Sequence, residues 1–305
     1  MKIMVFDVGG TEIKYSVMDE QMHRTNSGAV PTPQNTQAQF LDAVYRLYAP
    51  HKDEVSGIAM ALPGFVDNRT GYVSNGGALL YNTATPVGQL LAEKCGCPVI
   101  LENDGKAAAM AELANGALKD FCNAAVFIIG TGVGGGIIAN GQLVRGVHFT
   151  AGEYSFVNTN AEAWDAPDQN MACQCSTSNL LKWYRARKAL PEDAPLDGRS
   201  FFAAANAGEP EALEVLRRFC HAVAVQIYNL TVLLDVEKVA IGGGISKQPL
   251  LLESLRSAYD GLYASRAGQA YMEGLPRCQI VPCAFSSEAN QVGVAAAYFE
   301  AMQKK

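Results

Sequence analysis

The sequence lacks features that would assign it to several large classes of protein. No cluster of Lys and Arg appears in its 305 residues, and its formal net charge is −6. A nucleic-acid partner or an anionic membrane surface would require basic patches or a basic amphipathic helix. The sequence also contains no Gly-x-x-x-x-Gly-Lys-Ser/Thr segment, which excludes the P-loop class. We therefore expect no nucleic acid and no membrane among its partners.

Long hydrophobic runs are missing as well. Asp7 interrupts the first apolar segment, and the longest later one, 222–236, contains Gln226, Asn229 and Asp235. These runs are too interrupted for a signal-peptide core or a membrane-spanning helix of about 20 residues. We expect a cytoplasmic protein. Its eight cysteines form no disulfide framework in a chain of this length, so we expect them to be reduced and mainly packed.

Two glycine-rich turns follow hydrophobic runs, at 7–11 (Asp-Val-Gly-Gly-Thr) and 130–136 (Gly-Thr-Gly-Val-Gly-Gly-Gly). Glycine lets backbone N–H groups approach an anion closely. The second turn also matches Gly-x-Gly-x-x-Gly, with Glu153 where a dehydrogenase would bind ribose, but that fingerprint opens a helix, whereas the hairpin dipeptide Asn140-Gly141 follows here. One such turn could be purely structural. The pair favours two phosphate-binding hairpins, and a dehydrogenase is the weaker alternative.

A third glycine segment, 242–244, follows a predicted strand. Such a segment could lie flat against a purine ring, and Ser246 could cap the helix that follows. A plain strand-to-helix turn would have the same pattern. The three glycine segments together strengthen the prediction of a nucleotide site.

One predicted strand, 98–101, runs into Glu102-Asn103-Asp104 and then an alanine-rich helix at 106–118. A carboxylate at the end of a strand, facing a cleft, can accept the proton of a substrate hydroxyl as that oxygen attacks a γ-phosphoryl group. Asp104 is therefore the predicted base. Because Asp is a preferred helix N-cap, capping is the alternative role for Asp104.

The length exceeds about 150 residues per domain, which predicts two lobes around a cleft. We expect an N-terminal lobe at 1–115, completed by a C-terminal helix at 288–305, and a C-terminal lobe at 116–287. Hydrophobic periodicity predicts similar α/β element orders in the two halves. The predicted elements are a hairpin at 1–19, helices at 38–48 and 87–95 and a strand at 57–62, then a hairpin at 124–144, helices at 178–190, 209–234 and 249–264, strands at 238–241 and 279–281, and a loop at 191–199.

The first glycine turn, the Glu-Asn-Asp segment, the second glycine turn and the third glycine segment follow one another in this order along nearly the whole chain. Together they resemble the motifs of the ROK family of sugar kinases. That family has the two-lobed actin, hexokinase and Hsp70 (ribonuclease H-like) α/β fold with an interlobe cleft. The resemblance implies an ATP-dependent sugar kinase that uses ATP and Mg²⁺ and forms a homodimer. It implies that Asp104 is the general base, that Asp7 holds Mg²⁺ through water, and that Thr11 and Thr131 reach the phosphates.

The resemblance also implies two sets of binding residues. The ATP-binding and phosphate-binding set is Asp7, Gly9, Gly10, Thr11, Lys14, Gly130, Thr131, Gly132, Gly242, Gly243 and Gly244. The sugar-binding set is Gly76, Gly77, Asn103, Asp104, Glu153 and Gln174. Lys14 alternates with apolar residues along its strand and could instead point into solvent.

The chain departs from the family pattern where many members bind structural zinc. Phe156 occupies the place of a zinc-binding His, and after Cys173 and Cys175 no third cysteine follows until Cys220. Because a structural zinc site needs about four ligands, we expect no zinc site. Gln174 aligns with a family Glu, and Ala78 with an Asn that contacts sugar, which predicts a changed substrate preference.

Small residues at 76–78 and the segment Arg145-Gly146-x-x-Phe149-x-Ala151-Gly152-Glu153 resemble the β-glucoside kinases of the family. This subgroup implies phosphorylation of the 6-hydroxyl of a β-glucoside or a glucose-containing disaccharide. N-acetylmannosamine kinase and glucokinase activities stay open, and a non-catalytic sugar sensor is a remote alternative. ROK repressors carry an N-terminal helix-turn-helix, whereas this sequence begins directly on the first predicted strand.

Overall fold

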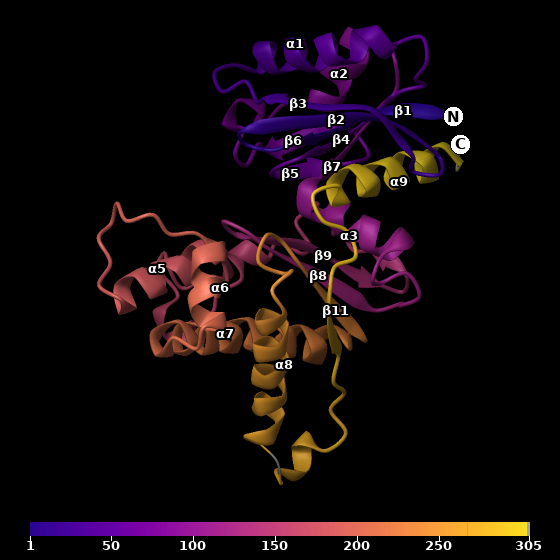
Figure 1. Ribbon diagram of the computed structural model, residues 1–305. Helices are drawn as coiled ribbons and strands as arrows, with labels where there is room; N and C mark the ends of the chain where they lie inside the picture. Colours follow the sequence, from indigo (N-terminus) through magenta and orange to yellow (C-terminus); the bar gives the residue numbers. More distant parts are fainter. Residues whose placement is uncertain (267, 304–305) are drawn as a thin grey trace. The chain divides into compact units, whose positions relative to one another are not determined.

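The computed structural model describes residues 1–266 and 268–303, and the chain divides into two compact units (Figure 1). Unit 1 contains Met1–Gly116, Leu143–Ala151 and the C-terminal segment from Ser287. Unit 2 contains Ala117–Gln142 and Gly152–Ser286.

Unit 1 is built on a five-stranded mixed sheet in the order β3-β2-β1-β4-β7. The first three strands along the chain are antiparallel neighbours, and β1, β4 and β7 run parallel. A small two-stranded sheet, β5-β6, accompanies it. The elements are β1 (Lys2–Val8), β2 (Glu12–Asp19), β3 (Arg24–Pro31), α1 (Gln37–Tyr48), β4 (Ile58–Leu62), β5 (Phe65–Asp67), β6 (Tyr72–Asn75), α2 (Val87–Cys95), β7 (Val99–Asn103), α3 (Asp104–Asn115) and α9 (Ala289–Gln303).

Helices cover both faces of this sheet, with α1 and α2 on one side and α9 on the other (Figure 1). Met4 and Phe6 of β1 belong to the core that also contains Phe40 of α1. Burying a side chain of this size contributes about 1.5–3 kcal/mol. α9 crosses α3 closely, because a Cβ on Gly293 would lie 1.7 Å from the carbonyl oxygen of Ala107. The first and last parts of the chain therefore share one hydrophobic unit.

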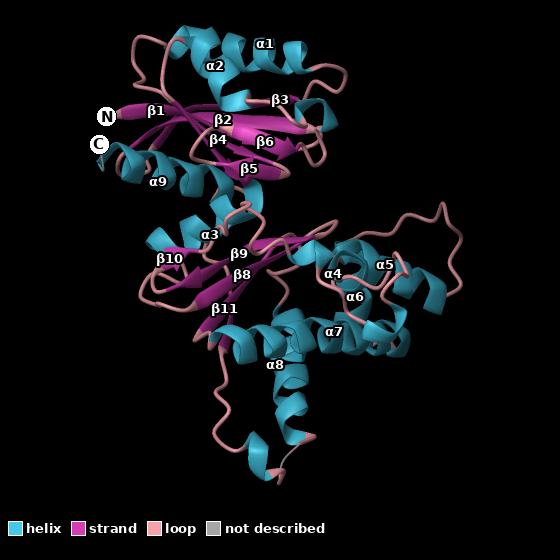
Figure 2. Ribbon diagram, turned by 180° about the vertical axis from the view of Figure 1, so that it is seen from behind, coloured by secondary structure: helices cyan, strands magenta, loops and turns pink. Residues whose placement is uncertain are grey.

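Unit 2 has a sheet in the order β10-β9-β8-β11-β12, with β8 and β9 antiparallel and β8, β11 and β12 parallel. Side chains of its strands and of α5 to α8 form one core; Figure 2 shows these helices gathered beside the sheet. The elements are β8 (Ala124–Ile129), β9 (Val133–Ala139), β10 (Gln142–Leu143), α4 (Met171–Gln174), α5 (Thr177–Arg187), α6 (Gly198–Asn206), α7 (Pro210–Leu234), β11 (Lys238–Gly242), α8 (Pro249–Ala264) and β12 (Gln279–Pro282).

The predicted hairpins at 1–19 and 124–144 are confirmed as β1–β2 and β8–β9. The predicted loop at 191–199 is wrong at its end, where α6 begins at Gly198. Asp197 and Ser200 form a reciprocal capping box there. The density of Pro and Asp before this point hides a helix start that the Asp-x-x-Ser spacing indicates.

No helix in the described part of the chain is both long and apolar enough to cross a membrane. All eight cysteines are free thiols. Cys175, Cys220 and Cys278 are buried, Cys122 is exposed, and the other four are partly buried. The prediction that the thiols are mainly packed is therefore confirmed for the three buried cysteines and wrong for Cys122.

Candidate active site

The first glycine turn, 9–11, joins β1 to β2 and is held by residues that directly follow β3. The Thr32 hydroxyl donates to the carbonyl oxygen of Gly9 at 2.8 Å, and the Gln34 amide donates to that of Gly10 at 2.7 Å. A Cβ on Gly10 would lie 3.1 Å from the Cβ of Ala78. The carbonyl groups of this turn are thus engaged within unit 1, and Thr11 at its end is exposed.

Asp7 and Lys14 face each other across β1 and β2. Burial raises the pKa of the Asp7 carboxyl, while the Asn290 side chain, which donates to it at 2.9 Å, and the positive charge of Lys14 lower it. Lys14 is half-buried and lines a pocket of about 340 Å³ with Arg24 and other residues. A nearby cation would offset the cost of keeping Asp7 charged in this setting.

The donor set around Asp7 suits Mg²⁺ better than zinc. Mg²⁺ usually keeps several waters and is held by one or two carboxylates together with substrate phosphates, so a single acid is compatible with it. Among residues 1–266 and 268–303, no group of three or more His, Cys, Asp or Glu could hold a metal ion. Asp7 therefore fits a water-mediated Mg²⁺ that phosphates help to bind.

The strand-to-helix junction at β7 and α3 holds Asp104 in a defined orientation. Asn103 is the N-cap of α3: its side-chain oxygen accepts from the N–H of Lys106 at 3.0 Å. The capping role considered for Asp104 thus belongs to Asn103, and the helix begins two residues earlier than predicted. Asp104 Oδ1 accepts from the N–H of Gly105 at 2.7 Å and from Asn103 Nδ2 at 3.1 Å. The N-terminus of α3 favours a negative charge at this position.

The predicted sugar-binding residues of unit 1 lie close to this junction. Asn103 Nδ2 also donates to the carbonyl oxygen of Gly64 at 2.9 Å. A Cβ on Gly77 would lie 2.8 Å from the backbone nitrogen of Gly64, and one on Gly64 would lie 2.8 Å from the carbonyl carbon of Gly76. The structure thus brings Gly76, Gly77, Asn103 and Asp104 to one corner of unit 1.

Glu153 and Gln174, the other two predicted sugar-binding residues, belong to unit 2. Glu153 precedes a short 3₁₀ turn, Tyr154–Phe156, in which the Phe156 side chain is exposed. Gln174 Nε2 donates to the carbonyl oxygen of Asp168 at 2.8 Å, so its amide nitrogen already binds the loop that precedes α4. In the described part of the chain, the side-chain oxygen of Gln174 accepts no hydrogen bond.

The second glycine turn, 130–132, joins β8 to β9 and borders a pocket of about 460 Å³. Gly130 N donates to the carbonyl oxygen of Gly132 at 3.0 Å, and Thr177 N donates to that of Gly130 at 2.9 Å. The volume lies within the range of about 300–1,000 Å³ that is typical of small-molecule sites. The pocket is lined by Ile129, Gly130, Thr131, Thr177, Ser178, Leu181, Asp197, Gly198, Arg199, Gly244, Ile245 and Gln248.

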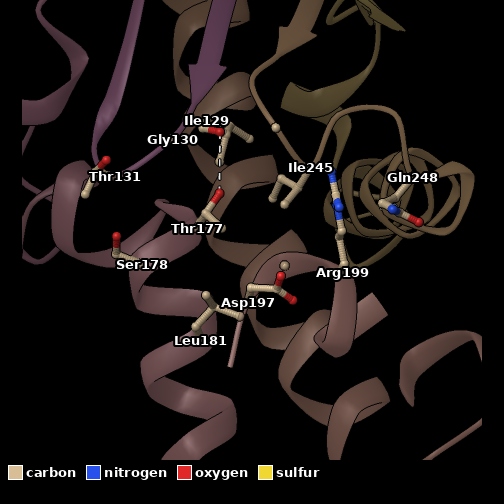
Figure 3. A pocket seen from close by; sticks show the side chains of 12 residues that line it. Ile129, Gly130, Thr131, Thr177, Ser178, Leu181, Asp197, Arg199, Ile245 and Gln248 are labelled. Carbon is tan, nitrogen blue, oxygen red and sulfur yellow. Dashed lines mark hydrogen bonds between the residues drawn. The ribbon is translucent and has the colours of Figure 1, made fainter. Parts of the chain in front are cut away.

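The third glycine segment meets the second at this pocket (Figure 3). Gly243 has φ +95°, and a Cβ there would lie 2.1 Å from the carbonyl oxygen of Ile129, so only glycine is accommodated. Gly130, Thr131 and Gly244 line the pocket, whereas Gly132, Gly242 and Gly243 support it from outside the lining. Ser246 does not cap α8, because its hydroxyl donates to the carbonyl oxygen of Gly243 and the helix begins at Pro249 with Gln248 as N-cap.

Several pocket residues were not among the predicted site residues. Thr177 and Ser178 begin α5, Asp197 is the N-cap of α6, and Arg199 lies in the first turn of α6. Thr131 and Ser178 lie on one side of the pocket, and Arg199 and Gln248 on the opposite side (Figure 3). The capping box at 197–200 could have predicted the start of a helix from the sequence. It could not have predicted that this helix start lies at the pocket.

Comparison with known proteins places this arrangement in a family. The model of the ROK family matches residues 3–302. A β-glucoside kinase from Listeria innocua serovar 6a is 31% identical over 258 residues, which are 84% of this chain and 87% of that protein.

Solved structures agree with this match. A ROK family protein from Streptococcus pneumoniae TIGR4, in complex with sucrose, has a TM-score of 0.87 and 28% identity, with all of both chains covered. A ROK family glucokinase from Streptomyces griseus, in complex with glucose and AMPPNP, has a TM-score of 0.79 and 25% identity, covering 97% of this chain and 99% of that one. These neighbours confirm the predicted two-lobed α/β fold class. Because the family model spans nearly the whole sequence, the chain belongs to the ROK family.

Proposed function

We propose that this protein transfers the γ-phosphoryl group of ATP to the 6-hydroxyl of a β-glucoside or a glucose-containing disaccharide. ATP-dependent carbohydrate kinase activity follows from family membership over nearly the whole chain and from the sugar-kinase relatives. The observation that supports the mechanism best is the arrangement of Asp104, whose Oδ1 is held by two donors at the start of α3.

Asp104 acts as the general base in this proposal. Its carboxylate takes the proton of the sugar hydroxyl while that oxygen forms a bond to the γ-phosphorus, the bond to the bridging oxygen breaks, and ADP leaves. Because Asn103 and the N–H of Gly105 hold Oδ1, the orientation of the carboxylate is set before the sugar binds. General-base catalysis of this kind contributes about 10²- to 10⁴-fold to the rate.

The nucleotide would occupy the pocket of unit 2. The turn 130–132 would hold phosphates with backbone N–H groups and the Thr131 hydroxyl, and the segment 242–244 would lie against the adenosine. In unit 1, Gly9, Gly10, Thr11 and Lys14 are the proposed phosphate-binding groups, and Asp7 would hold Mg²⁺ through water. The bound Mg²⁺ would neutralise charge on the phosphates.

The acceptor is proposed from two features. The small residues at 76–78 in unit 1 resemble those of the β-glucoside kinases, and Glu153 and Gln174 would supply further sugar contacts. The relative named as a β-glucoside kinase and the neighbour solved with sucrose support an acceptor larger than one hexose. Glucose itself is the second candidate, because the glucokinase neighbour was solved with glucose and AMPPNP.

A homodimer and a cytoplasmic location, where ATP is available, complete the proposal. Light scattering of the purified protein tests the dimer. A mass of about one chain, 32.5 kDa, at all concentrations would contradict it.

A coupled assay of ADP production over a panel of sugars tests the function. We expect the highest kcat/KM with cellobiose or an arbutin-like glucoside, a lower value with glucose, and the lowest with N-acetylmannosamine. Preference for glucose or N-acetylmannosamine would replace the proposed acceptor. Sugar binding without ADP production would indicate a sensor, and nicotinamide-cofactor reduction without ADP production would indicate a dehydrogenase.

A further inference from the structure

The segment 144–151, here called the strap, is part of unit 1 although the residues on either side of 143–151 belong to unit 2. The N–H of Ala151 donates to the carbonyl oxygen of Arg145 at 3.2 Å, which closes the strap into a loop. Gly152 and Glu153, a proposed sugar contact, follow it directly. The proposed function assigns the strap no role.

Two anchors hold the strap on unit 1. The first is Phe149, whose ring is buried and lies 4.6 Å beneath the guanidinium of Arg69. Phe149 has φ +60°, a conformation that bulky residues rarely adopt. Such backbone strain persists only where surrounding contacts over-determine it, and it concentrates at functional sites.

The second anchor is an ion pair between Arg145 and Glu102. Glu102 has no exposed surface, and its Oε2 accepts from Arg145 Nε at 2.9 Å and lies 2.8 Å from Nη2. The Arg145 side chain is 27% exposed. The other Glu102 oxygen, Oε1, accepts from the backbone N–H of Asn103 at 3.1 Å. Both oxygens of this buried carboxylate are therefore used, one by the strap and one by the residue before the proposed base.

We propose that Arg145 is a positioning residue for Asp104, acting through Glu102 and Asn103. This inference rests on the proposed function of Asp104 as the base. Arg145 holds Glu102, Glu102 holds the peptide of Asn103, and Asn103 Nδ2 holds Asp104 Oδ1 at 3.1 Å. The strap is thus linked through Glu102 to the junction of β7 and α3.

Loss of the ion pair with Arg145 would leave the buried Glu102 carboxylate without a positive partner. Without Arg145, the Glu102 carboxylate would have only one N–H donor in a site with no exposed surface, and it would move toward water or toward another donor. Asn103 would move with it. Because a displacement of about 1 Å at a catalytic group can lower the rate about 100-fold, the loss should appear in kcat more than in the KM for ATP.

Three variants separate positioning from stability. Arg145→Met removes the charge. Arg145→Lys keeps a positive charge but loses the contact of two guanidinium nitrogens with Glu102 Oε2. The double variant Arg145→Met with Glu102→Gln removes both charges while keeping an acceptor for the Asn103 N–H. Arg187→Met is the matched control, because Arg187 forms an ion pair of 2.8 Å with Glu214 in which both side chains are about half exposed.

We expect Arg145→Met to lower kcat about 30- to 100-fold with less than a threefold change in the KM for ATP. Arg145→Lys should regain part of the loss, and the double variant should recover thermal stability but not full kcat. Arg187→Met should leave kcat within about twofold. A kcat for Arg145→Met within fivefold of wild type, or a double variant that regains wild-type kcat together with its stability, would overturn the proposal.

Hydrogen exchange of backbone amides gives a readout that does not depend on activity. The N–H groups of Asn103 and Gly105 should lose protection in Arg145→Met, while those of α7 in unit 2 keep theirs. Unchanged protection at Asn103 would overturn the proposal even in an inactive protein. Absence of ADP production by wild-type protein with every sugar would instead reject the proposed function.

Discussion

The two units share a strand order but differ in the chemistry placed at the ends of their strands. In unit 1, β1 carries Asp7 next to the glycine turn, and the edge strand β7 is followed by Asp104. In unit 2, the corresponding β8 ends on Ile129 and the edge strand β12 on Pro282. Unit 1 therefore presents two carboxylates, which we propose bind Mg²⁺ and accept a proton, and unit 2 presents backbone groups, which we propose hold the nucleotide. The comparison predicts that substitution of Asp104 at the edge strand of unit 1 affects the chemical step and that substitutions in the glycine segments of unit 2 affect the nucleotide or the fold.

The largest expected effect is on kcat, from substitution of Asp104, which follows the edge strand of unit 1. Asp104→Asn should lower kcat about 10³-fold, because the amide cannot accept the hydroxyl proton, whereas its carbonyl oxygen can still accept from the Gly105 N–H. Dissociation constants for sugar and ATP, measured by calorimetry, should change less than about threefold. Retention of more than a few per cent of kcat would remove Asp104 from the mechanism.

A second prediction concerns the cradle of unit 2. Gly243→Ala should lower the free energy of unfolding of unit 2 by about 2–3 kcal/mol, because φ +95° is strained for alanine and its Cβ would meet the Ile129 carbonyl oxygen. Gly244→Ala is the matched control, since a Cβ there would have no atom within 4 Å. Calorimetric melting would compare the two variants. Equal melting temperatures would show that the close contact between Gly243 and the Ile129 carbonyl oxygen does not affect stability.

A smaller effect follows from the raised pKa of Asp7. A carboxyl whose pKa is higher in the folded state than in the unfolded state stabilises the fold below the unfolded pKa, and this stabilisation is lost as pH rises through the folded pKa. Asp7→Asn should therefore raise the melting temperature at pH 7 by a few degrees, with a difference that shrinks as pH falls toward about 4. The Asn side chain still accepts from Asn290. A lower melting temperature at pH 7 would mean that the charge of Asp7 is stabilised in the free protein.

The smallest expected effect is that of chelation on the region 156–175. This segment is held by hydrogen bonds such as those from Gln174 to Asp168 and from the Cys173 N–H to the Asn170 side chain. We expect treatment with EDTA, followed by restoration of Mg²⁺, to leave the melting temperature and the KM for sugar unchanged. Elemental analysis should find no stoichiometric zinc, and a content near one zinc per chain would contradict this.

Much of the fold could be predicted from local sequence patterns. Alternating apolar residues and glycine-rich turns predict the two hairpins, because strand periodicity and positive-φ turns depend on neighbouring residues. Helix α6 (Gly198–Asn206) was not predicted at all, since its capping box follows a segment rich in Pro and Asp that was interpreted as a loop. Asp104 and Asn103 are both good N-caps by residue type, so the choice between them depended on the backbone that β7 imposes.

The sequence by itself determined the family, most of the elements other than α6, and which residue types could hold phosphate or accept a proton. Only the tertiary structure decided that Asn290 binds Asp7 across 283 positions of the chain, that α5 and α6 border the pocket of unit 2, and that Arg145 holds Glu102 behind Asp104. Motifs reflect conformations that a few adjacent residues specify. Partners far apart in sequence meet only after the helices have packed on their sheets, and no local pattern encodes that packing.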